Sequence, residues 1–378
     1  MASVGGVGSP RLAAASSLAA LEKLPKAELH LHLRGAIPRA YLARQLRRYP
    51  VAEALAASPP SQLEWMLRQP NVRRIVEADD PSRAIEGLFR YATFEHFLAA
   101  YLFTASFVRC IEDFAGLVEG VREELGRQNI VYAEITVSLS EYVQQGIALD
   151  ELLAVLGAAR PGSPQVRWII DPVRNLGPAA AEELVTSVLA ARTETVVGLT
   201  LGGAEHLYPA GPFRRVYEIA REGGLRTTVH AGEALGPESV WDALRILDVE
   251  RVGHGVRAVE DTDLVRCLAE RRIPLEVCPT SNVRTGVYAS LLEHPVRDLH
   301  EAGVPVTINT DDPTFFGVTL AEELAGLREL EFSWDEVAEL ADNAFRFAFD
   351  RRAAARIGCH ASQRTRECAD CSSASQCP

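Results

Sequence analysis

The sequence predicts an α/β protein built as a (β/α)8 TIM barrel with a helical insertion after the first strand. Short segments rich in β-branched residues alternate with helical stretches from residue 27 to about residue 310, as a parallel sheet covered by helices requires. Eight such segments are present, and eight strands close a barrel of this type. Polar motifs follow several of them, at the end where barrel enzymes carry their active sites. The chain of 378 residues fits a single barrel domain, which we place at residues 23–355.

The expected strands are short and largely apolar. The run Trp168-Ile169-Ile170 is typical of a strand that helices cover on the outside of a barrel. We place the eight strands at residues 27–33, 130–137, 166–171, 196–201, 226–230, 250–253, 274–278 and 305–309.

A long segment separates the first two expected strands. Its stretches 38–48, 61–68 and 82–127 have a helical pattern, which predicts a helical insertion over the barrel mouth. Two further helices, near 319–328 and 334–349, complete the domain. Apolar residues of the insertion recur at helical spacing, and they form either a packed helix face or part of a lid over a substrate: Phe94, Phe97, Leu98, Tyr101, Leu102 and Ala105.

The two ends of the chain differ in composition from the predicted domain. Residues 1–22 are rich in Ala, Gly and Ser and lack the apolar core of a secretory signal, so we expect a disordered leader. Residues 356–378 are rich in Ser and Cys, and we expect a disordered, reduced tail. The alternative is a small structural zinc site, built from a single Cys-x-x-Cys pair and its neighbours: Cys359, His360, Cys368, Cys371 and Cys377.

The charge balance favours a small-molecule partner. The chain carries 51 acidic and 39 basic residues, a formal net charge of −12, and 47% of its residues are hydrophobic. An acidic surface repels nucleic acid and anionic membranes, and no run approaches the roughly 18 apolar residues of a membrane helix. We therefore expect a cytoplasmic enzyme that binds neither nucleic acid nor a membrane. The oligomeric state is not indicated.

Lysine is nearly absent from the chain. It occurs only at Lys23 and Lys26, both before the first motif described below. A carbamylated lysine bridging two metals, or a lysine Schiff base inside the barrel, would need a lysine at a later strand end. A single metal ion is the simpler expectation.

Two histidines one residue apart, His30 and His32, carry the clearest prediction of chemistry. They lie on the first expected strand, where alternate side chains point the same way. His230 ends the fifth expected strand, and Asp311 follows the eighth. A catalytic zinc takes about three or four ligands from His and carboxylate, keeps a position for water, and lowers the pKa of that water to about 7. The four residues predict one Zn²⁺ per subunit.

Three more residues lie at the ends of expected strands. Glu233 comes just after a predicted ligand and could donate a proton to a substrate. His254, on the next strand, is placed to orient the attacking water and to take part in its deprotonation. Asp312 adjoins the ligand Asp311 in an extended segment, so its side chain must point elsewhere. We expect it to contact the substrate, with a carboxylate that caps the following turn as the alternative.

Over residues 24–350 the chain resembles the adenosine deaminase family of metal-dependent hydrolases. The family's pattern is an HxH motif followed by HAGE, GHG, a CP-x-S segment and NTDDP. The corresponding segments occur here in the same order: His30-Leu31-His32, His230-Ala231-Gly232-Glu233, Gly253-His254-Gly255, Cys278-Pro279-Thr280-Ser281-Asn282 and Asn309-Thr310-Asp311-Asp312-Pro313.

The resemblance implies a role for each residue of these motifs. His30, His32, His230 and Asp311 would bind zinc. Glu233 would protonate N1 of a purine, His254 would hold the attacking water, Asp312 would accept a hydrogen bond near N7, and the backbone of Gly203 would meet N3. The implied reaction is attack on C6, a tetrahedral intermediate and loss of ammonia, so the enzyme would be a hydrolase acting on a cyclic amidine. Protonation of N1 makes C6 electrophilic, and the acid is therefore needed on chemical grounds as well.

One departure from the family pattern concerns the substrate. Adenosine deaminases usually have an Asp two residues after the second histidine, beside the ribose 5′-oxygen, whereas this chain has Arg34. Arginine binds carboxylates through two parallel hydrogen bonds. A subgroup of the family deaminates 6-amino-6-deoxyfutalosine, whose 5′ side ends in a carboxybenzoyl group, during menaquinone biosynthesis, and Arg34 would face that benzoate. The alternative is that Arg34 pairs with a protein acid such as Glu205.

A second departure lies in the segment Gly198–Glu205. Thr200 replaces the usual Asp, and Gly203-Ala204-Glu205 replaces GDE. Gly203 keeps the contact to N3 possible, while its changed neighbours suggest a different surrounding for the ribose side. Adenine deaminases of the family often carry a Glu at the position of Arg34, which disfavours a free base.

Three hypotheses follow. The first is a zinc-dependent nucleoside deaminase, with aminodeoxyfutalosine ahead of adenosine or deoxyadenosine in purine metabolism. The second is a nucleoside-binding relative without turnover, although such proteins usually lose a ligand or the acid and this chain keeps them. The third is another hydrolase with one metal, such as an amidase, which would not need Asp312 or the loop at Gly203.

Overall fold

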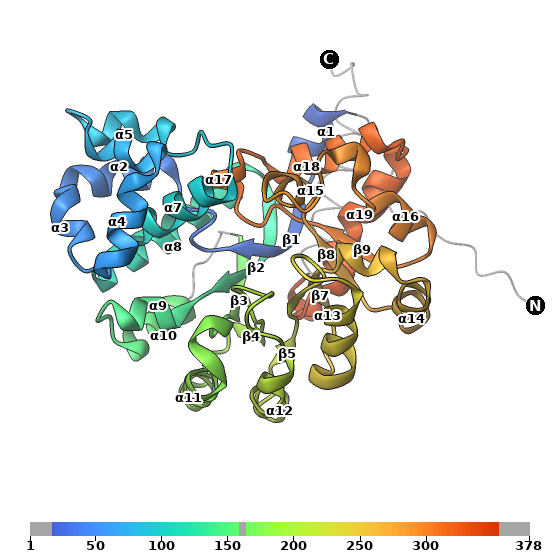
Figure 1. Cartoon of the computed structure of the whole chain (residues 1–378). Coiled ribbons are helices and arrows are strands. Elements are labelled where there is room, and N and C mark those ends of the chain that lie inside the picture. Colours follow the sequence, from blue (N-terminus) through green and yellow to red (C-terminus); the bar gives the residue numbers. More distant parts are fainter. Residues whose placement is uncertain (1–16, 159–163, 355–378) are drawn as a thin grey trace, which may run out of the picture.

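The computed structural model describes residues 17–158 and 164–354. Nine short parallel strands form two sheets, in the orders β1-β2-β3-β4-β5 and β6-β7-β8-β9, which together curl into a barrel (Figure 1). The strands are β1 Lys26–His32, β2 Ile130–Val137, β3 Gln165–Ile170, β4 Val196–Leu199, β5 Arg226–Thr227, β6 His230–Ala231, β7 Val252–His254, β8 Leu275–Val277 and β9 Val306–Ile308.

Hydrogen bonds across the two seams close the barrel. Thr228, between β5 and β6, donates its N–H to the carbonyl of Leu199 at 2.9 Å, so β5 and β6 are one barrel strand with an interruption. At the other seam the backbone N–H of Asp311 donates to the carbonyl of His30 at 3.1 Å, and the backbone N–H of His32 donates to the carbonyl of Asp311 at 2.9 Å. The predicted TIM barrel is confirmed, with the strand at 226–230 divided in two and several strands shorter than expected.

The insertion follows β1 and forms a helical cluster beside the barrel (Figure 1). The stretch 82–127 is not one helix, because a 3-10 turn and two non-helical connections interrupt it, and Thr93 begins a new helix by accepting the N–H of His96 at 3.4 Å. The elements are α2 Arg39–Arg48, α3 Val51–Leu55, α4 Pro60–Arg68, α5 Pro70–Val76, α6 Pro81–Ala84, η1 Ile85–Gly87, α7 Phe94–Ala105 and α8 Ile111–Arg127.

Most of the remaining helices follow the strands and cover the outside of the barrel (Figure 1). Side chains of β1 alternate accordingly: Leu29 packs outward in a cluster with Ala344 and Ala348 of the C-terminal segment, which leaves His30 for the interior. The helices are α9 Leu139–Gln144, α10 Leu149–Gly157, α11 Gly177–Ala191, α12 Arg214–Glu222, α13 Pro237–Asp242, α14 Thr262–Arg271, α15 Pro279–Arg284, α16 Val296–Glu301, α17 Pro313–Phe316, α18 Leu320–Gly326 and α19 Trp334–Phe347.

The structure shortens the expected leader. Leu18–Lys23 form a helix, α1, whose first turn is capped by Ser17 and whose Leu21 is fully buried, because an apolar side chain at this position packs against the barrel domain. The rest of the leader and the Cys-rich tail lie outside the described residues. Among the residues that are described, none of the helices combines the length and apolar character needed to cross a bilayer.

Candidate metal centre and active site

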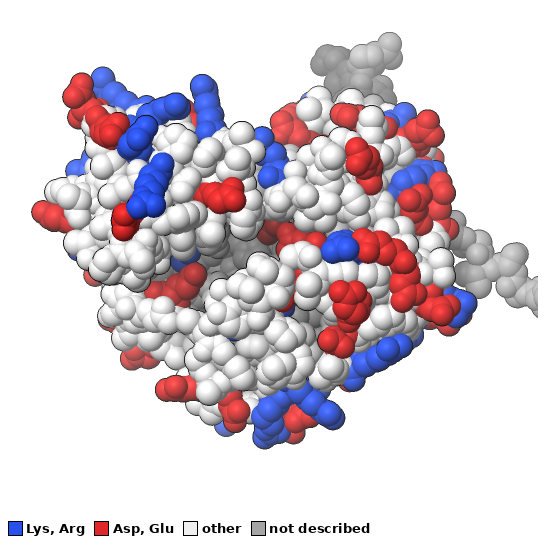
Figure 2. Space-filling view, viewed as in Figure 1, with Lys and Arg blue, Asp and Glu red and all other residues white. Residues whose placement is uncertain are grey.

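The four predicted metal ligands converge inside the barrel mouth. Nε2 of His32 lies 3.1 Å from Nε2 of His230. Oδ1 of Asp311 lies 3.3 Å from Nε2 of His32 and 3.6 Å from Nε2 of His30. All four side chains are buried or nearly so. Figure 2 shows that this face of the molecule is hollowed between the insertion and the barrel. The structure thus brings together residues that lie up to 281 positions apart.

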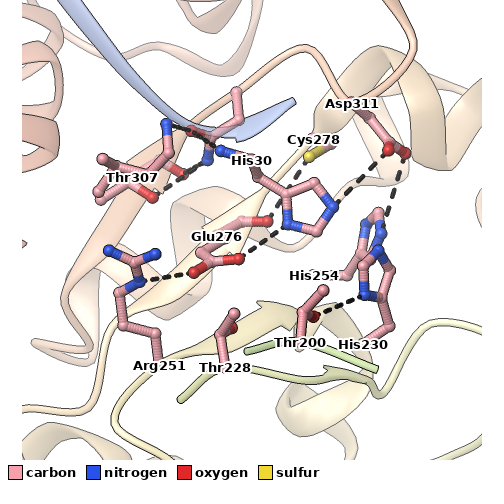
Figure 3. Close-up of polar contacts among 12 residues, drawn as sticks. His30, Thr200, Thr228, His230, Arg251, His254, Glu276, Cys278, Thr307 and Asp311 are labelled. Carbon is pink, nitrogen blue, oxygen red and sulfur yellow. Dashed lines mark hydrogen bonds and ion pairs between the residues drawn. The ribbon is translucent and has the colours of Figure 1, made fainter. Parts of the chain in front are cut away.

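The nitrogen atoms of these histidines fit a divalent metal ion. Nδ1 of His30 donates to Oε2 of Glu276 at 2.8 Å (Figure 3), so its Nε2 is left unprotonated when the ring is neutral, and that buried atom has no hydrogen-bond partner. Nδ1 of His230 lies 3.4 Å from the hydroxyl of Thr200. A carboxylate or hydroxyl behind each ring is how proteins orient ligating histidines. The donor set of three imidazoles and one carboxylate suits zinc.

Backbone conformation aims two of the site's side chains. His254 at the end of β7 has φ +57° and Asp311 just after β9 has φ +62°, a left-handed conformation that few non-glycine residues adopt. Such residues cost on the order of 1–3 kcal/mol each and cluster at functional sites. The turn out of the strand direction points both side chains toward the metal position. Gly253 precedes His254 because a Cβ there would lie 3.0 Å from Cε1 of His30.

Asp311 stays ionised among the imidazoles. Burial acts to raise its pKa, but the neighbouring imidazoles of His30, His254 and His32 hold the pKa well below its usual value. Ser281 donates to its Oδ2 at 2.7 Å. The buried thiol of Cys278 also lies beside this group, and burial raises its pKa well above the usual value. Cys278 is therefore a neutral thiol, and we do not include it among the candidate ligands.

Glu233 lies next to His254, with Oε2 3.6 Å from Nε2 of the histidine. Burial, the charge of Asp311 and the charge of Glu205 raise the pKa of Glu233 to about 8. Its carboxyl group therefore carries a proton at neutral pH, as an acid catalyst requires. Glu205 holds this loop in place by accepting the N–H groups of Gly232 at 2.9 Å and Ala234 at 2.7 Å.

Asp312 has different side-chain surroundings from Asp311. Its Oδ1 is buried and has no hydrogen-bond partner, and burial together with the charge of Asp311 raises its pKa well above the usual value. Gly35 leaves the room that this side chain occupies, since a Cβ there would fall 1.8 Å from Oδ1 of Asp312. This carboxyl group, with an oxygen that the protein leaves unpaired, is available to a ligand in the site.

Arg34 is buried beside the site and pairs with a different acid from the one considered above. Its Nη2 donates to Oε2 of Glu141 in α9, whereas Glu205 belongs to the loop of Glu233. The guanidinium lies 4.8 Å from the ring centre of Tyr101 in α7 and 6.0 Å from that of Tyr142. Its Nε is buried without a hydrogen-bond partner. Arg34 is thus fixed on one side and retains an unpaired donor.

The aromatic face of the insertion is both packed and close to the site. Phe97 stacks on Phe316 of α17 with ring centres 5.2 Å apart, and Tyr101 lies 5.5 Å from Phe315. Since α17 begins directly after Asp312, the insertion packs onto the segment that carries a site residue. Phe94, by contrast, is 49% exposed.

Gly203 lies on the exposed rim of the loop after β4, with φ +101°. A Cβ there would lie 2.3 Å from Oδ1 of Asn175, which accepts the N–H of Ala204 at 2.9 Å. Gly203 therefore belongs to the loop that follows β4 and does not join the cluster of metal ligands.

The sequence patterns did not identify several residues that support the site. Glu276 behind His30, Glu205 behind the Glu233 loop and Glu141 behind Arg34 are all buried or half-buried acids. Glu276 could have been found, because an acid in a three-residue buried strand needs a partner. The other two lie in loops or short helices without a comparable pattern.

Comparison with known proteins agrees with this geometry. The adenosine deaminase family model matches residues 25–356. The chain is 38% identical to an aminodeoxyfutalosine deaminase of Streptomyces avermitilis, over 88% of this chain and 89% of that protein. It is 36% identical to an adenine deaminase of Sinorhizobium medicae, over 86% of this chain and 94% of that protein.

Among solved structures, the chain is similar to an adenine deaminase from Arthrobacter aurescens. The TM-score is 0.74 at 27% identity, and the match covers 91% of this chain and 99% of the other. Together with the family match, this shows a deaminase of adenine-type substrates. The chain belongs to the adenosine deaminase family.

Proposed function

We propose that this chain is a zinc-dependent deaminase of 6-amino-6-deoxyfutalosine, in a step of menaquinone biosynthesis. The observation that carries the choice of substrate is Arg34, a buried guanidinium beside the site with an unpaired Nε–H donor. A carboxylate on the 5′ side of the nucleoside would satisfy that donor. The similarity to an aminodeoxyfutalosine deaminase over most of both chains supports the same substrate.

The residues of the site have separate roles in the proposed reaction. Zinc held by His30, His32, His230 and Asp311 would supply a Lewis acid that makes water acidic enough to attack at neutral pH. Glu233, protonated at neutral pH, gives its proton to N1 of the purine, which makes C6 electrophilic.

The deamination conserves every atom and proton. The oxygen of one water molecule bonds to C6, and the bond from C6 to its amino nitrogen breaks. One proton of that water leaves with the amino group as ammonia, and the other restores the protonated form of Glu233. The proton that Glu233 gave stays on N1 of the product. Asp312, whose pKa is raised well above the usual value by burial and by the charge of Asp311, is protonated and donates a hydrogen bond to N7 of the base. The backbone of Gly203 contacts N3.

The second candidate substrate is free adenine. Relatives named adenine deaminase are up to 36% identical to this chain over 86% of its length. A free base carries no 5′ group and would leave Arg34 with Glu141 alone. Adenosine is the third substrate to be compared. A chain that deaminates none of the three substrates would be the nucleoside-binding relative or the other hydrolase with one metal considered above.

The prediction for substrate choice concerns Arg34→Gln. We expect kcat/KM for aminodeoxyfutalosine to fall by the equivalent of about 2–4 kcal/mol, because a buried charge pair with the substrate is lost. Turnover of adenosine, adenine and methylthioadenosine should change much less. The measurement is the ultraviolet change on deamination for each substrate. Arg39→Gln is the matched control, since Arg39 lies close by in the sequence but is 40% exposed and pairs with Glu86. Equal losses on all four substrates would contradict the assignment.

The prediction for the metal concerns removal and reloading. Dialysis against a chelator should abolish deamination, and one equivalent of Zn²⁺ should restore it. His230→Gln should bind zinc at least 10–100-fold more weakly, the loss seen when even outer partners of metal sites are removed. His300→Gln is the control, because His300 contacts Glu336 outside the site. Equal zinc affinity in both variants would refute the ligand assignment. If the full chain binds two equivalents of Zn²⁺ and a chain ending at residue 355 binds one, the second zinc site lies in the tail.

A further inference from the structure

A chain of hydrogen bonds runs from the backbone of α16 to His254, through two buried residues outside the predicted site. Val296 donates its N–H to Nδ1 of His294 at 3.2 Å. Nε2 of His294 lies 3.1 Å from Oδ1 of Asn282, and Nδ2 of Asn282 lies 3.2 Å from Nδ1 of His254. His294, Asn282 and His254 are at most 3% exposed, so water cannot replace these partners.

The backbone N–H at the start fixes the direction of every bond in this chain. A backbone amide can only donate, so Nδ1 of His294 must accept and its Nε2 must carry the ring's proton. That N–H can only face the carbonyl oxygen of Asn282, which settles the orientation of the amide. The amide nitrogen then faces His254 and donates. Burial lowers the pKa of His294 to about 3, in keeping with a neutral ring.

These hydrogen bonds determine the tautomer of His254. Its Nδ1 must accept from Asn282, so the proton of the neutral ring sits on Nε2. That atom faces the site, 3.6 Å from Oε2 of Glu233 and 3.9 Å from Oδ2 of Asp311. A nitrogen that already carries a proton can donate a hydrogen bond to an oxygen atom, but it cannot take a proton from water.

We propose that His294 and Asn282 are positioning residues that hold His254 as the Nε2–H tautomer, so that His254 acts as a hydrogen-bond donor to the attacking oxygen and not as a general base. The catalytic part of this statement rests on the proposed function, whereas the tautomer does not. It narrows the role expected from the sequence, in which His254 also helped to deprotonate the water. The proton must then pass to a carboxylate, and Glu233 is adjacent.

The Asn282 backbone holds the amide in position for this role. Asn282 lies in α15, its N–H donates to the carbonyl of Cys278 at 3.0 Å, and its carbonyl accepts from Val287 and Tyr288 at 2.9 and 3.1 Å. The ring of Tyr288 lies 5.2 Å from that of His294. The middle of the side-chain relay at Asn282 and its start at Val296 are therefore fixed by main-chain contacts.

The test is the tautomer of His254, read by NMR of the full chain labelled with ¹⁵N-histidine and loaded with Zn²⁺, without substrate. Signals of His254 are assigned by their loss in His254→Asn. We expect a protonated Nε2 and an unprotonated Nδ1. Asn282→Asp presents a carboxylate, which can only accept from Nδ1 when ionised, so it should move the proton to Nδ1. A protonated Nδ1 in the wild-type chain, or no change in Asn282→Asp, would overturn the proposal.

Kinetics and control variants separate this role from a purely structural one. In Asn282→Asp, kcat should fall by about 10–100-fold, as for other outer partners of catalytic groups, while KM changes little. His294→Gln keeps a donor toward Asn282 and should preserve the wild-type tautomer, whereas His294→Leu should give a mixture. Tyr288→Phe, which removes a neighbouring hydroxyl outside the relay, should leave both the spectrum and kcat unchanged.

The variants also distinguish a wrong relay from a variant that does not fold and from a wrong proposed function. If Asn282→Asp is unfolded by circular dichroism, the His294→Gln and His294→Leu pair decides the point, and equal tautomers in those two variants would refute the relay. A chain that deaminates none of the purines but shows the Nε2–H tautomer would overturn the proposed function alone. A chain that deaminates aminodeoxyfutalosine but shows Nδ1–H would overturn the relay alone.

Discussion

Glu233→Gln is expected to reduce kcat for deamination by about 10²–10⁴-fold, the range that a positioned general acid contributes. The amide has the shape of the protonated carboxyl group but cannot give up a proton to N1. Substrate binding should be largely preserved, so KM should change little. Steady-state rates on the substrate that the wild-type chain prefers measure the effect.

The pH dependence of the same pair of enzymes identifies the acid. The pKa of Glu233 is raised to about 8 by burial and by the charges of Asp311 and Glu205. The protonated form is the active one, so wild-type kcat/KM should be retained below that pH and fall as the pH rises through it. This limb should disappear in Glu233→Gln.

Glu205→Gln tests the electrostatic cause, because it removes a negative charge while its amide oxygen can still accept from one side of the Glu233 loop. Its alkaline limb should move to lower pH, since one cause of the raised pKa of Glu233 is gone. A Glu233→Gln enzyme with undiminished kcat would show that another group protonates the base.

Arg251→Met is expected to lower the free energy of unfolding by about 3–5 kcal/mol, as when one partner of a buried ion pair is removed. Arg251 is 1% exposed. Its guanidinium lies 2.7 Å from Oε2 of Glu134 and 2.6 Å from Oε1 of Glu276, and it donates to the carbonyl of Phe347 at 2.9 Å. Without it, two buried carboxylates lose the positive charge that both contact.

Urea denaturation of the metal-free protein measures this loss without a contribution from bound zinc. Arg167→Gln is the matched control, because Arg167 pairs with Asp350 at 2.8 Å but both side chains are partly exposed. We expect it to cost about 1 kcal/mol or less, as for exposed pairs. Similar losses in the two variants would show that burial of the Arg251 cluster does not govern its contribution.

The Arg251 cluster also reaches the metal site. Glu276 accepts from both Arg251 and Nδ1 of His30, and Figure 3 shows the three side chains in one row inside the barrel. A stable interior and a correctly oriented ligand therefore depend on the same carboxylate. This coupling explains why an arginine lies fully buried in a barrel that could have been filled with apolar side chains.

Much of the candidate site was predictable because its residues obey local rules. The spacing of His30 and His32 places both on one face of a strand, and the ends of parallel strands meet at one rim of a barrel. Those two facts were enough to predict that His230 and Asp311 would join them. The insertion was also predictable from its helical periodicity, but its division at Thr93 was not, since a cap within a long helical pattern is a weak indicator.

The amino-acid sequence by itself determined the barrel and the convergence of four possible metal ligands, because each depends on strand periodicity and strand ends. Only the tertiary structure decided that Arg34 pairs with Glu141 rather than Glu205, and that His294 and Asn282 stand behind His254. These partners come from different loops and helices. Packing of the whole chain brings them within hydrogen-bonding distance, and no pattern within one segment predicts these contacts.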